Sequence, residues 1–246
     1  MADLLGPAAI LLVAFVVLGV TGFGSALIAV PLLSWFWPLP EVVALMVSLD
    51  LVASIVHGGL NLAAVQWRAI AKLVPGSLLG VALALVFLQK LPPQWPLVAL
   101  GLYVTWVGWR ALRPARQNSP SRTPGPVYTA AIGTVVGIIE LLFGTSGPPI
   151  VAWMSLQLHD VRQVRASTPV ALVFVSLIAL AGMATDGRLS TALHWQRFGL
   201  LLPVALVGVT VGHKFAGKLP DQRLRKIVCG LLVVSGLALI VRALLA

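Results

Sequence analysis

Long apolar stretches separated by short polar gaps run along the whole sequence. The first of them, residues 4–36, contains no charged residue and no histidine. As a single helix rising about 1.5 Å per residue it would be about 50 Å long, whereas the hydrocarbon of a bilayer is about 30 Å thick. Gly22 and Gly24 lie near its middle, and glycines and prolines at 144–149 interrupt a second long stretch, 127–158. The pattern therefore predicts two broken helical segments.

Six further apolar spans complete the pattern, and they divide into two similar halves. The polar stretch 113–126 separates an N-terminal repeat, 1–112, from a C-terminal repeat, 127–246. Pairs of residues at one offset, such as Trp67 with Trp195 and Gly108 with Gly236, indicate a duplication. We predict an all-α polytopic membrane protein in which each repeat has a broken helical hairpin, 4–36 or 127–158, and three transmembrane helices. These six helices are expected at 42–63, 69–88, 95–112, 166–183, 198–213 and 227–245.

The positions of the lysines and arginines orient the two repeats. If each broken segment crosses the membrane once, these residues divide nine to eight between the two sides, which favours no orientation. If each broken segment instead turns back to the side from which it entered, 13 of the 17 fall on one side. Positive residues accumulate on the cytoplasmic side, so the second arrangement is favoured. It predicts re-entrant hairpins, an inverted second repeat and a cytoplasmic linker at 113–126, although two full crossings per broken segment would give the same count.

Composition supports a membrane protein and narrows the chemistry. Of the 246 residues, 59% are hydrophobic and 10% are charged, whereas soluble domains carry about 25% charged residues. The formal charge of +10 comes from basic residues in the gaps between spans, so no nucleic-acid partner is expected. The sequence has neither metal-ligand spacing among its His, Cys, Asp and Glu residues nor a glycine–lysine loop for phosphate. We therefore expect neither an enzyme nor an ATP-driven pump, and no cofactor or metal.

The two breaks form the predicted binding site. After each break a new helix begins, and its first amide groups have no partner within the helix and carry about half a positive charge. Two such helix N-termini that meet near the membrane midplane would hold an anion without a buried cation. The alternative is that the glycines only allow close helix packing, as small residues do in membranes; two aligned breaks in over-long segments favour the site. The predicted substrate-binding residues are Thr21, Gly22, Phe23, Gly24, Ser25, Gly144, Thr145, Ser146, Gly147 and Pro148.

Three ionisable residues lie within the apolar spans. Glu140 is one helical turn before the second break, and an ionised carboxylate at this depth costs about 3 kcal/mol unless it is paired. Asp50, His57 and Asn61 are spaced to share one face of a helix. Glu140, Asp50 and His57 are the candidates for proton coupling, while a purely structural role, such as joining helices, stays open for each. His194 lies at the end of a span and is expected at the membrane interface.

The sequence around both breaks resembles a known family. Residues 19–33, GVTGFGSALIAVPLL, and residues 142–151, LFGTSGPPIV, are similar to the two signatures of the sulfite exporter TauE/SafE family. The likeness extends over the whole chain in length and repeat layout. It implies a permease of the bacterial inner membrane for sulfur-containing anions such as sulfite, sulfoacetate or other organosulfonates. By position, its binding motifs would be 22–26 and 144–149.

The sequence thus predicts a multi-pass secondary transporter that exports a small sulfur-containing anion held between two helix N-termini. A monoanion leaving a cell with a negative interior gains about 2.3 kcal/mol per 100 mV, so export can run without a coupling ion. Uptake would need a co-transported cation, and proton-coupled uptake is the second alternative. A passive anion channel and a membrane assembly factor also stay open. The expected partners are the anion, protons and the bilayer, and the sequence leaves a homodimer open.

Overall fold

The computed structural model of the protein describes residues 4–88, 92, 94–112, 125–158, 160–215 and 221–245. All regular structure in these residues is helical. The first half contains α1 (Leu5–Thr21), α2 (Ser25–Leu33), α3 (Leu39–Gly58), the short 3-10 helix η2 (Gly59–Ala64), α4 (Trp67–Leu88) and α5 (Gln94–Leu112). The second half contains α6 (Pro126–Phe143), α7 (Gly147–Gln157), α8 (Val161–Thr185), α9 (Ala192–Phe215) and α10 (Asp221–Leu245).

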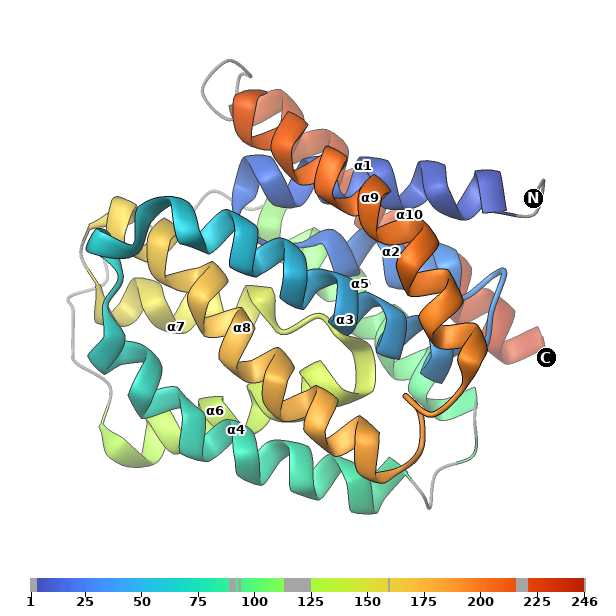
Figure 1. The fold of residues 1–246 in the computed structure, drawn as a ribbon. Helices are drawn as coiled ribbons and strands as arrows, with labels where there is room; N and C mark the ends of the chain where they lie inside the picture. The colour runs from blue at the N-terminus through green and yellow to red at the C-terminus, as the bar shows by residue number, and fades with distance from the viewer. Residues whose placement is uncertain are drawn as a thin grey trace.

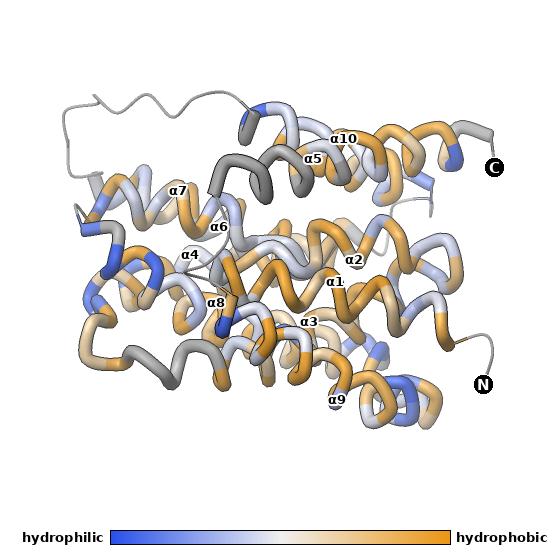
Figure 2. Tube along the Cα trace, turned by 90° about the horizontal axis from the view of Figure 1, so that it is seen from above, coloured by the Kyte–Doolittle hydropathy of each residue, from blue (hydrophilic) through white to orange (hydrophobic). Residues whose placement is uncertain are grey.

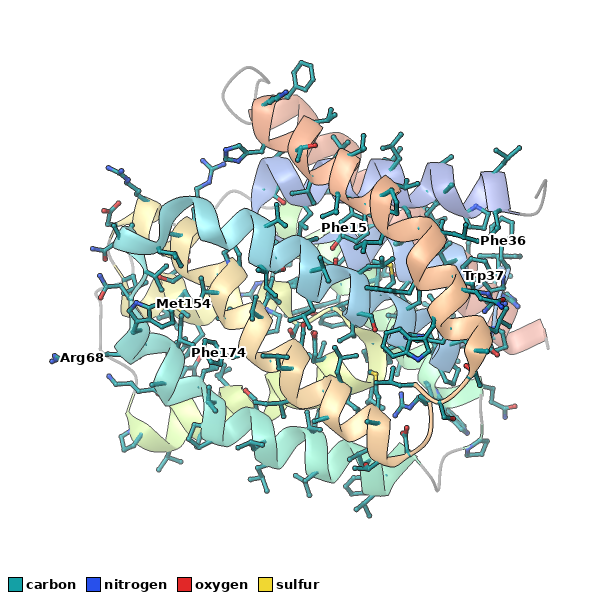
Figure 3. All side chains as sticks on the ribbon, in the orientation of Figure 1. Phe15, Phe36, Trp37, Arg68, Met154 and Phe174 are labelled. Atoms are coloured by element: carbon teal, nitrogen blue, oxygen red, sulfur yellow. The ribbon has the colours of Figure 1, made fainter. Side chains whose placement is uncertain are left out.

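The helices have the length and composition of membrane spans. In the described part, α3, α4, α6, α8 and α9 are long and apolar enough to cross a membrane, and α1 is a shorter apolar helix. Figure 2 shows hydrophobic residues along the helices and hydrophilic residues mainly near helix ends. Arg68 lies at one end of the molecule, and the aromatic residues Phe36 and Trp37 lie at the other (Figure 3). The chain is a multi-pass α-helical membrane protein.

Both predicted breaks are present, and glycine makes them sterically feasible. Helix α1 ends at Gly22, with φ 84°, and Gly24, with φ 98°, precedes α2. Helix α6 ends at Gly144, with φ 63°. Residues with a Cβ rarely adopt such left-handed conformations. The Gly22 amide donates to Leu18 O at 2.7 Å and the Gly144 amide to Glu140 O at 2.8 Å, so both first arms end in the same left-handed cap.

Each broken pair doubles back on itself, and the two pairs enter from opposite ends of the molecule. In Figure 1 both chain termini lie on the right; α1 runs from right to left and α2 returns to the right. Helix α6 runs from left to right and α7 returns to the left (Figure 1). Helices α2 and α7 have 9 and 11 residues, so at 1.5 Å per residue they are only about 14 and 17 Å long. They are too short to cross the hydrocarbon.

Glycines bring pairs of helices from the two halves into backbone contact. A Cβ on Gly19 of α1 would lie 2.3 Å from Val209 O of α9, and one on Gly80 of α4 would lie 2.1 Å from Thr134 O of α6. Only glycine permits such close approach. Helices α1 and α6 are the first arms of the two breaks, and α4 and α9 are the second long helices that follow the breaks in their own halves. Exchanging the halves therefore turns the α1–α9 pair into the α6–α4 pair. Phe15 of α1 is buried in this packing (Figure 3).

Helices α5 and α10 correspond to each other and cross antiparallel. Gly101 faces Gly236, and Gly108 faces Cys229; a Cβ on Gly101 would lie 2.8 Å from Gly236 O, and one on Gly108 would lie 3.1 Å from Cys229 O. Gly101 and Cys229 are separated by the same number of residues as Gly108 and Gly236. Exchanging the two halves therefore converts one contact into the other, which adds a three-dimensional argument to the sequence matches.

Several helix boundaries differ from the prediction. Helices α8 and α9 begin at Val161 and Ala192, earlier than the predicted 166 and 198, because their polar first turns continue the helix beyond the apolar core. The Asp160 side chain caps α8 by accepting from the Arg162 amide at 2.8 Å. Helix α3 ends at Gly58 rather than 63. The consecutive glycines 58 and 59 disfavour the α-helix there, and a 3-10 turn follows.

Close packing at Gly80 predicts a large loss of stability on substitution. Gly80→Val would force side-chain atoms into the α6 backbone, and overpacking of this kind costs about 1–3 kcal/mol or more. We expect a markedly lower unfolding temperature and less monodisperse protein in detergent, measured by fluorescence-detected size exclusion after heating. Gly199→Val on α9 is the control, since a Cβ there meets nothing within 4 Å. Equal stability of the two variants would contradict the α4–α6 packing.

Candidate functional site

The two breaks meet at one small cavity inside the helical bundle. A Cβ on Gly147, the first residue of α7, would lie 3.1 Å from Phe23 Cβ in the first break. The cavity beside them has a volume of about 20 Å³, which is room for about one water molecule. It is lined by Leu18, Gly24, Ser25, Ala26, Leu27, Asp50, Glu140, Gly144, Thr145, Gly147, Pro148, Leu172 and Ser176. Two segments far apart in the sequence thus share one site.

The second arms of both breaks present helix N-termini to this cavity. Helix α2 begins at Ser25 after Gly24, and α7 begins at Gly147 after Ser146; neither cap residue makes a side-chain hydrogen bond to the helix. The amides of the first turn of α2 therefore lack a capping side chain. In α7 this holds for the Gly147 amide, because Pro148 and Pro149 have no N–H and the Ile150 amide donates to Ser146 O at 3.2 Å. Both helix ends carry the positive end of the helix dipole. Thr145 lines the cavity and is buried, yet its Oγ1 has no hydrogen-bond partner among the described residues. The site thus contains an unused hydroxyl beside an uncapped helix end.

Two carboxyl groups also face this cavity. Asp50 of α3 accepts a hydrogen bond from Ser25 Oγ at 2.6 Å. Glu140 of α6, which is 1% exposed, accepts from Ser146 Oγ at 2.6 Å, from the Ser146 amide at 3.2 Å and from Ser176 Oγ of α8 at 2.7 Å. Every one of these donors is a neutral group, so neither carboxyl has a cation as a hydrogen-bond partner.

The two halves use the same connection with the roles exchanged. In the first half, the serine is on the break and the acid is on the following long helix, α3. In the second half, the acid, Glu140, lies one helical turn before the break. The serine, Ser176, is on the following long helix, α8. Each break is therefore joined to the next long helix of its own half by a serine–carboxyl hydrogen bond. These connections hold the tips in position around the cavity.

Positive charge lies outside the cavity, at the ends of the first arms. The Arg165 guanidinium donates to Val20 O at 3.0 Å, in the last turn of α1. The Arg188 guanidinium lies 3.5 Å from Leu141 O, in the last turn of α6, and also pairs with Asp186. Cations stabilise the negative ends of helices. No lysine or arginine is among the residues that line the cavity, so any anion there would depend on dipoles and hydroxyl groups.

The structure brings together part of the predicted site. Six of the predicted substrate-binding residues and two of the proton-coupling candidates line the cavity: Gly24, Ser25, Gly144, Thr145, Gly147, Pro148, Asp50 and Glu140. Thr21, Gly22, Phe23 and Ser146 do not line it. The Thr21 hydroxyl instead bonds Val17 O at 2.8 Å and Phe23 O, which holds the turn of the first break. Ser146 lies behind the surface, where it holds Glu140.

One sequence interpretation needs correction. Asn61 is not on the face of α3 with Asp50, because the α-helix ends at Gly58 and Asn61 lies in η2. The side chain of His57, the third proton-coupling candidate, lies outside the described residues. His194, which is expected at the membrane interface, packs against α3: it is 6% exposed, and its Nε2 lies 3.5 Å from Ser48 Oγ. The earlier start of α9 places His194 on a helix that packs against α3. Its interfacial position stays a prediction.

Sequence reasoning missed Ser176, Tyr103 and Arg165. Ser176 is a lone serine in an apolar helix, a pattern that does not distinguish the bundle interior from the lipid face. Tyr103 of α5 donates its hydroxyl to Thr145 O at 3.0 Å and stacks on Phe143 with ring centroids 6.2 Å apart. A tyrosine within an apolar span does indicate a needed hydrogen-bond partner. The partner itself depends on the fold.

Tyr103 is expected to position the second break. Tyr103→Phe removes one hydrogen bond and leaves Thr145 O unpaired, a loss of about 1–3 kcal/mol. We expect substrate affinity to fall about 5- to 100-fold, measured by equilibrium binding to purified protein. The control is Tyr128→Phe, which removes a hydroxyl from an exposed tyrosine near the start of α6. If both variants bind equally well, Tyr103 does not position the break.

The described helices and the two interrupted segments, which share one small cavity, define a class, the multi-pass α-helical membrane proteins. The sequence model of the family described as Sulfite exporter TauE/SafE matches residues 8–239. The chain belongs to this family. The curated relatives it matches are also named as transporters rather than as enzymes.

Two of these relatives match over most of the chain. The chain is 39% identical over 195 residues to the probable inner membrane transporter protein TsaS of Comamonas testosteroni. The aligned region covers 79% of this chain and 81% of that protein. The chain is also 25% identical over 233 residues to the probable sulfite/organosulfonate exporter TauE of Cupriavidus necator. This aligned region covers 92% of this chain and 90% of the relative. No solved structure matches the chain.

Proposed function

We propose that this transporter exports a small sulfur-containing anion, such as sulfite, sulfoacetate or another organosulfonate, across the bacterial inner membrane. We place its binding site in the cavity between the two breaks. The observation that carries the proposal is that both breaks line one small cavity beside two helix N-termini without a capping side chain. The relative from Cupriavidus necator is named for sulfite and organosulfonate export, and the one from Comamonas testosteroni for the inner membrane. These names support the substrate class and the location.

The proposed coordination of the anion uses backbone amides and hydroxyl groups. Sulfite and sulfonates carry three oxygens on one sulfur, and amides at a helix N-terminus point toward such oxygens. The donors that we assign to it are the amides of the first turn of α2, the Gly147 amide of α7 and the Thr145 hydroxyl. A cavity of about 20 Å³ has room for about one water molecule, so it must widen when an oxyanion enters. We therefore interpret the structure as a closed state of the transport cycle.

The proposed transport cycle relies on two inverted repeats. Oppositely directed first arms, the interchangeable α1–α9 and α6–α4 pairs and the antiparallel α5–α10 crossing support this relation. Inverted repeats allow a protein to open its central site to either side by equivalent movements. On this basis each hairpin forms half of the site and moves with its own repeat.

Export follows from voltage if the anion moves alone. With a negative interior, each outward negative charge gains about 2.3 kcal/mol per 100 mV. Proton-coupled uptake is the alternative favoured by one observation, the two carboxyl groups in the cavity. A passive channel would require a continuous open path, whereas the cavity described here is small.

Counterflow in proteoliposomes tests the proposed function. Vesicles loaded with unlabelled sulfoacetate should accumulate labelled sulfoacetate transiently, because a carrier exchanges internal for external substrate. Sulfite and methanesulfonate should compete, whereas chloride at the same concentration should not. Flux without counterflow would indicate a channel. Failure to bind or exchange any of the three sulfur anions would overturn the proposal.

A further inference from the structure

Glu140 occupies hydrogen-bond donors at the start of α7, next to the donors assigned to the anion. Its Oε2 accepts from both the amide and the hydroxyl of Ser146, the residue that caps α7, and its Oε1 accepts from Ser176 Oγ. A carboxylate group has two oxygens in a plane and uses the same donors as a sulfonate. Glu140 therefore takes a position at the break that resembles that of a bound anion.

Asp50 has the corresponding position at the first break. Its Oδ1 accepts from Ser25 Oγ, and Ser25 is the first residue of α2. Asp50 and Glu140 both line the cavity that Gly24, Thr145 and Gly147 also line. Thr145 Oγ1 is the one cavity hydroxyl in the described breaks that stays without a partner while the carboxyl groups hold the two serines. This unused hydroxyl points to a ligand that is bound in another state.

An anion cannot share this cavity with two ionised carboxylates at low energetic cost. Like charges a few ångströms apart repel strongly where water is excluded, and no lysine or arginine among the lining residues compensates for them. Two outcomes remove the repulsion: the anion stays out, or the carboxyl groups are neutral when it enters. Protonation is the simplest neutralisation, because the described residues contain no group of three or more acidic, His or Cys side chains that could hold a metal ion.

We propose that Glu140 and Asp50 act as resident anions of the empty site, and that they take up protons as the sulfur anion enters and displaces them from the break serines. This inference rests on the proposed function, since it assumes that an oxyanion binds in the cavity. Anion and protons then bind together and cross together. Each proton carried cancels one negative charge, so the voltage contributes less to export, and an inward proton gradient drives uptake through the same site.

The other titratable groups around the two carboxyls are not hydrogen-bonded to them. Tyr103 of α5 reaches the second break only through Thr145 O, and His194 of α9 lies by Ser48, two residues before Asp50. Helices α2 and α7 contain no titratable side chain. The remaining charged groups with described side chains lie near the ends of neighbouring helices. None of them bonds to either carboxyl: Glu41, Arg68, Lys72, Arg110, Asp160, Arg162, Arg165, Asp186, Arg188, Arg197, Lys214 and Arg242.

Binding of sulfoacetate at a series of pH values tests the proposal. Sulfoacetate stays fully ionised near neutral pH, so any proton taken up on binding is bound by the protein. Purified wild-type protein in detergent should remove protons from a weakly buffered solution when sulfoacetate is added, as a pH indicator would report. Its dissociation constant should rise about tenfold per pH unit for each proton taken up.

Two variants assign the protons to residues. Glu140→Gln and Asp50→Asn each imitate the neutral carboxyl, so each should reduce proton uptake and flatten the pH dependence, and the double variant should bind independently of pH. Glu140→Gln should also bind more tightly than wild type at high pH, since the competing charge is gone. Glu41→Gln is the control: its carboxyl pairs with Arg197 on the exposed surface, and wild-type behaviour is expected.

The outcomes separate the inference from the proposed function. Binding of sulfoacetate by wild type without proton uptake, and with one affinity at every pH, would overturn the inference and leave the proposed function standing. No binding of sulfite, sulfoacetate or methanesulfonate at any pH would instead remove the proposed function. If Glu140→Gln does not fold, the wild-type proton uptake and the Asp50→Asn slope still decide the matter.

Discussion

Gly147→Leu is expected to abolish transport while the protein still inserts in the membrane. A Cβ at this position lies 3.1 Å from Phe23 Cβ and 3.3 Å from Phe23 Cδ2, and the leucine branches extend further between the two breaks. The added side chain fills the space beside the Gly147 amide, the first of α7, at the cavity. Overpacking of a tight contact costs up to about 3 kcal/mol, which is a factor of about 150 in binding. Counterflow of labelled sulfoacetate should therefore fall to background.

The matched control for this variant is Gly199→Leu. It introduces the same side chain in α9, where a Cβ meets nothing within 4 Å, so flux should stay at the wild-type level. Both variants should be recovered from the membrane in similar amounts and elute as single species. Wild-type flux in Gly147→Leu would remove the cavity from the transport path. Loss of flux in Gly199→Leu would show instead that the assay responds to any added bulk.

The sequence allowed the breaks to be predicted because their cause is local. An apolar stretch too long for the bilayer, with glycines at its middle, has few conformations available to it, and left-handed φ at Gly22, Gly24 and Gly144 is a property of those residues. The distribution of lysines and arginines likewise predicted that the segments turn back. The direction of the short second arms in Figure 1 agrees with that prediction. Pattern and length thus predicted the two breaks, which each segment determines alone.

The residues that complete the site could not be predicted, because they depend on contacts between segments. Ser176 is an ordinary serine of an apolar helix until α8 packs against α6 and brings it to 2.7 Å from Glu140. The contact of His194 with Ser48 of α3 was not predicted, because the apolar core of its span begins after it, whereas the helix begins at Ala192. Asn61 was placed on a continuous helix, and only two consecutive glycines ended that helix earlier. Each error concerns how a segment ends or what it contacts.

Serine–carboxyl hydrogen bonds connect the two hairpin tips to the helices that must move if the site is to open. Ser25 is bonded to α3 through Asp50, and Glu140 is bonded to α8 through Ser176. Breaking either connection frees a tip and also frees a serine hydroxyl that lines the cavity. In the proposed cycle, entry of the anion and opening of the cavity therefore require the same hydrogen bonds to break, so that the carboxyl group and the anion compete for these serines. This competition is a physical means by which binding and movement become coupled in a small site.

Thr145→Val is expected to separate binding from stability. Valine has nearly the shape of threonine and lacks the hydroxyl, and Thr145 Oγ1 is buried without a partner in the closed state. Removing a buried polar atom that has no partner does not destabilise the fold and can stabilise it. The same hydroxyl is assigned to the bound anion, where a hydrogen bond to a charged group contributes about 1.5–3 kcal/mol. We expect the unfolding temperature to stay equal or rise, and sulfoacetate affinity to fall about 10- to 100-fold.

The control for this substitution is Thr129→Val in α6, whose Oγ1 donates to Gly125 O at 3.1 Å, outside the residues that line the cavity. It loses a local hydrogen bond, so its stability should fall slightly while its affinity stays unchanged. The two variants are thus expected to differ in opposite ways: Thr145→Val loses affinity but not stability, and Thr129→Val loses stability but not affinity. Thermal unfolding and equilibrium binding, measured on the same samples, check both. If Thr145→Val binds as tightly as wild type, the Thr145 hydroxyl does not contact the anion, and the donors would be restricted to the amides of α2 and α7. If it instead destabilises the protein, the hydroxyl has a structural partner, and the argument from an unused donor is lost.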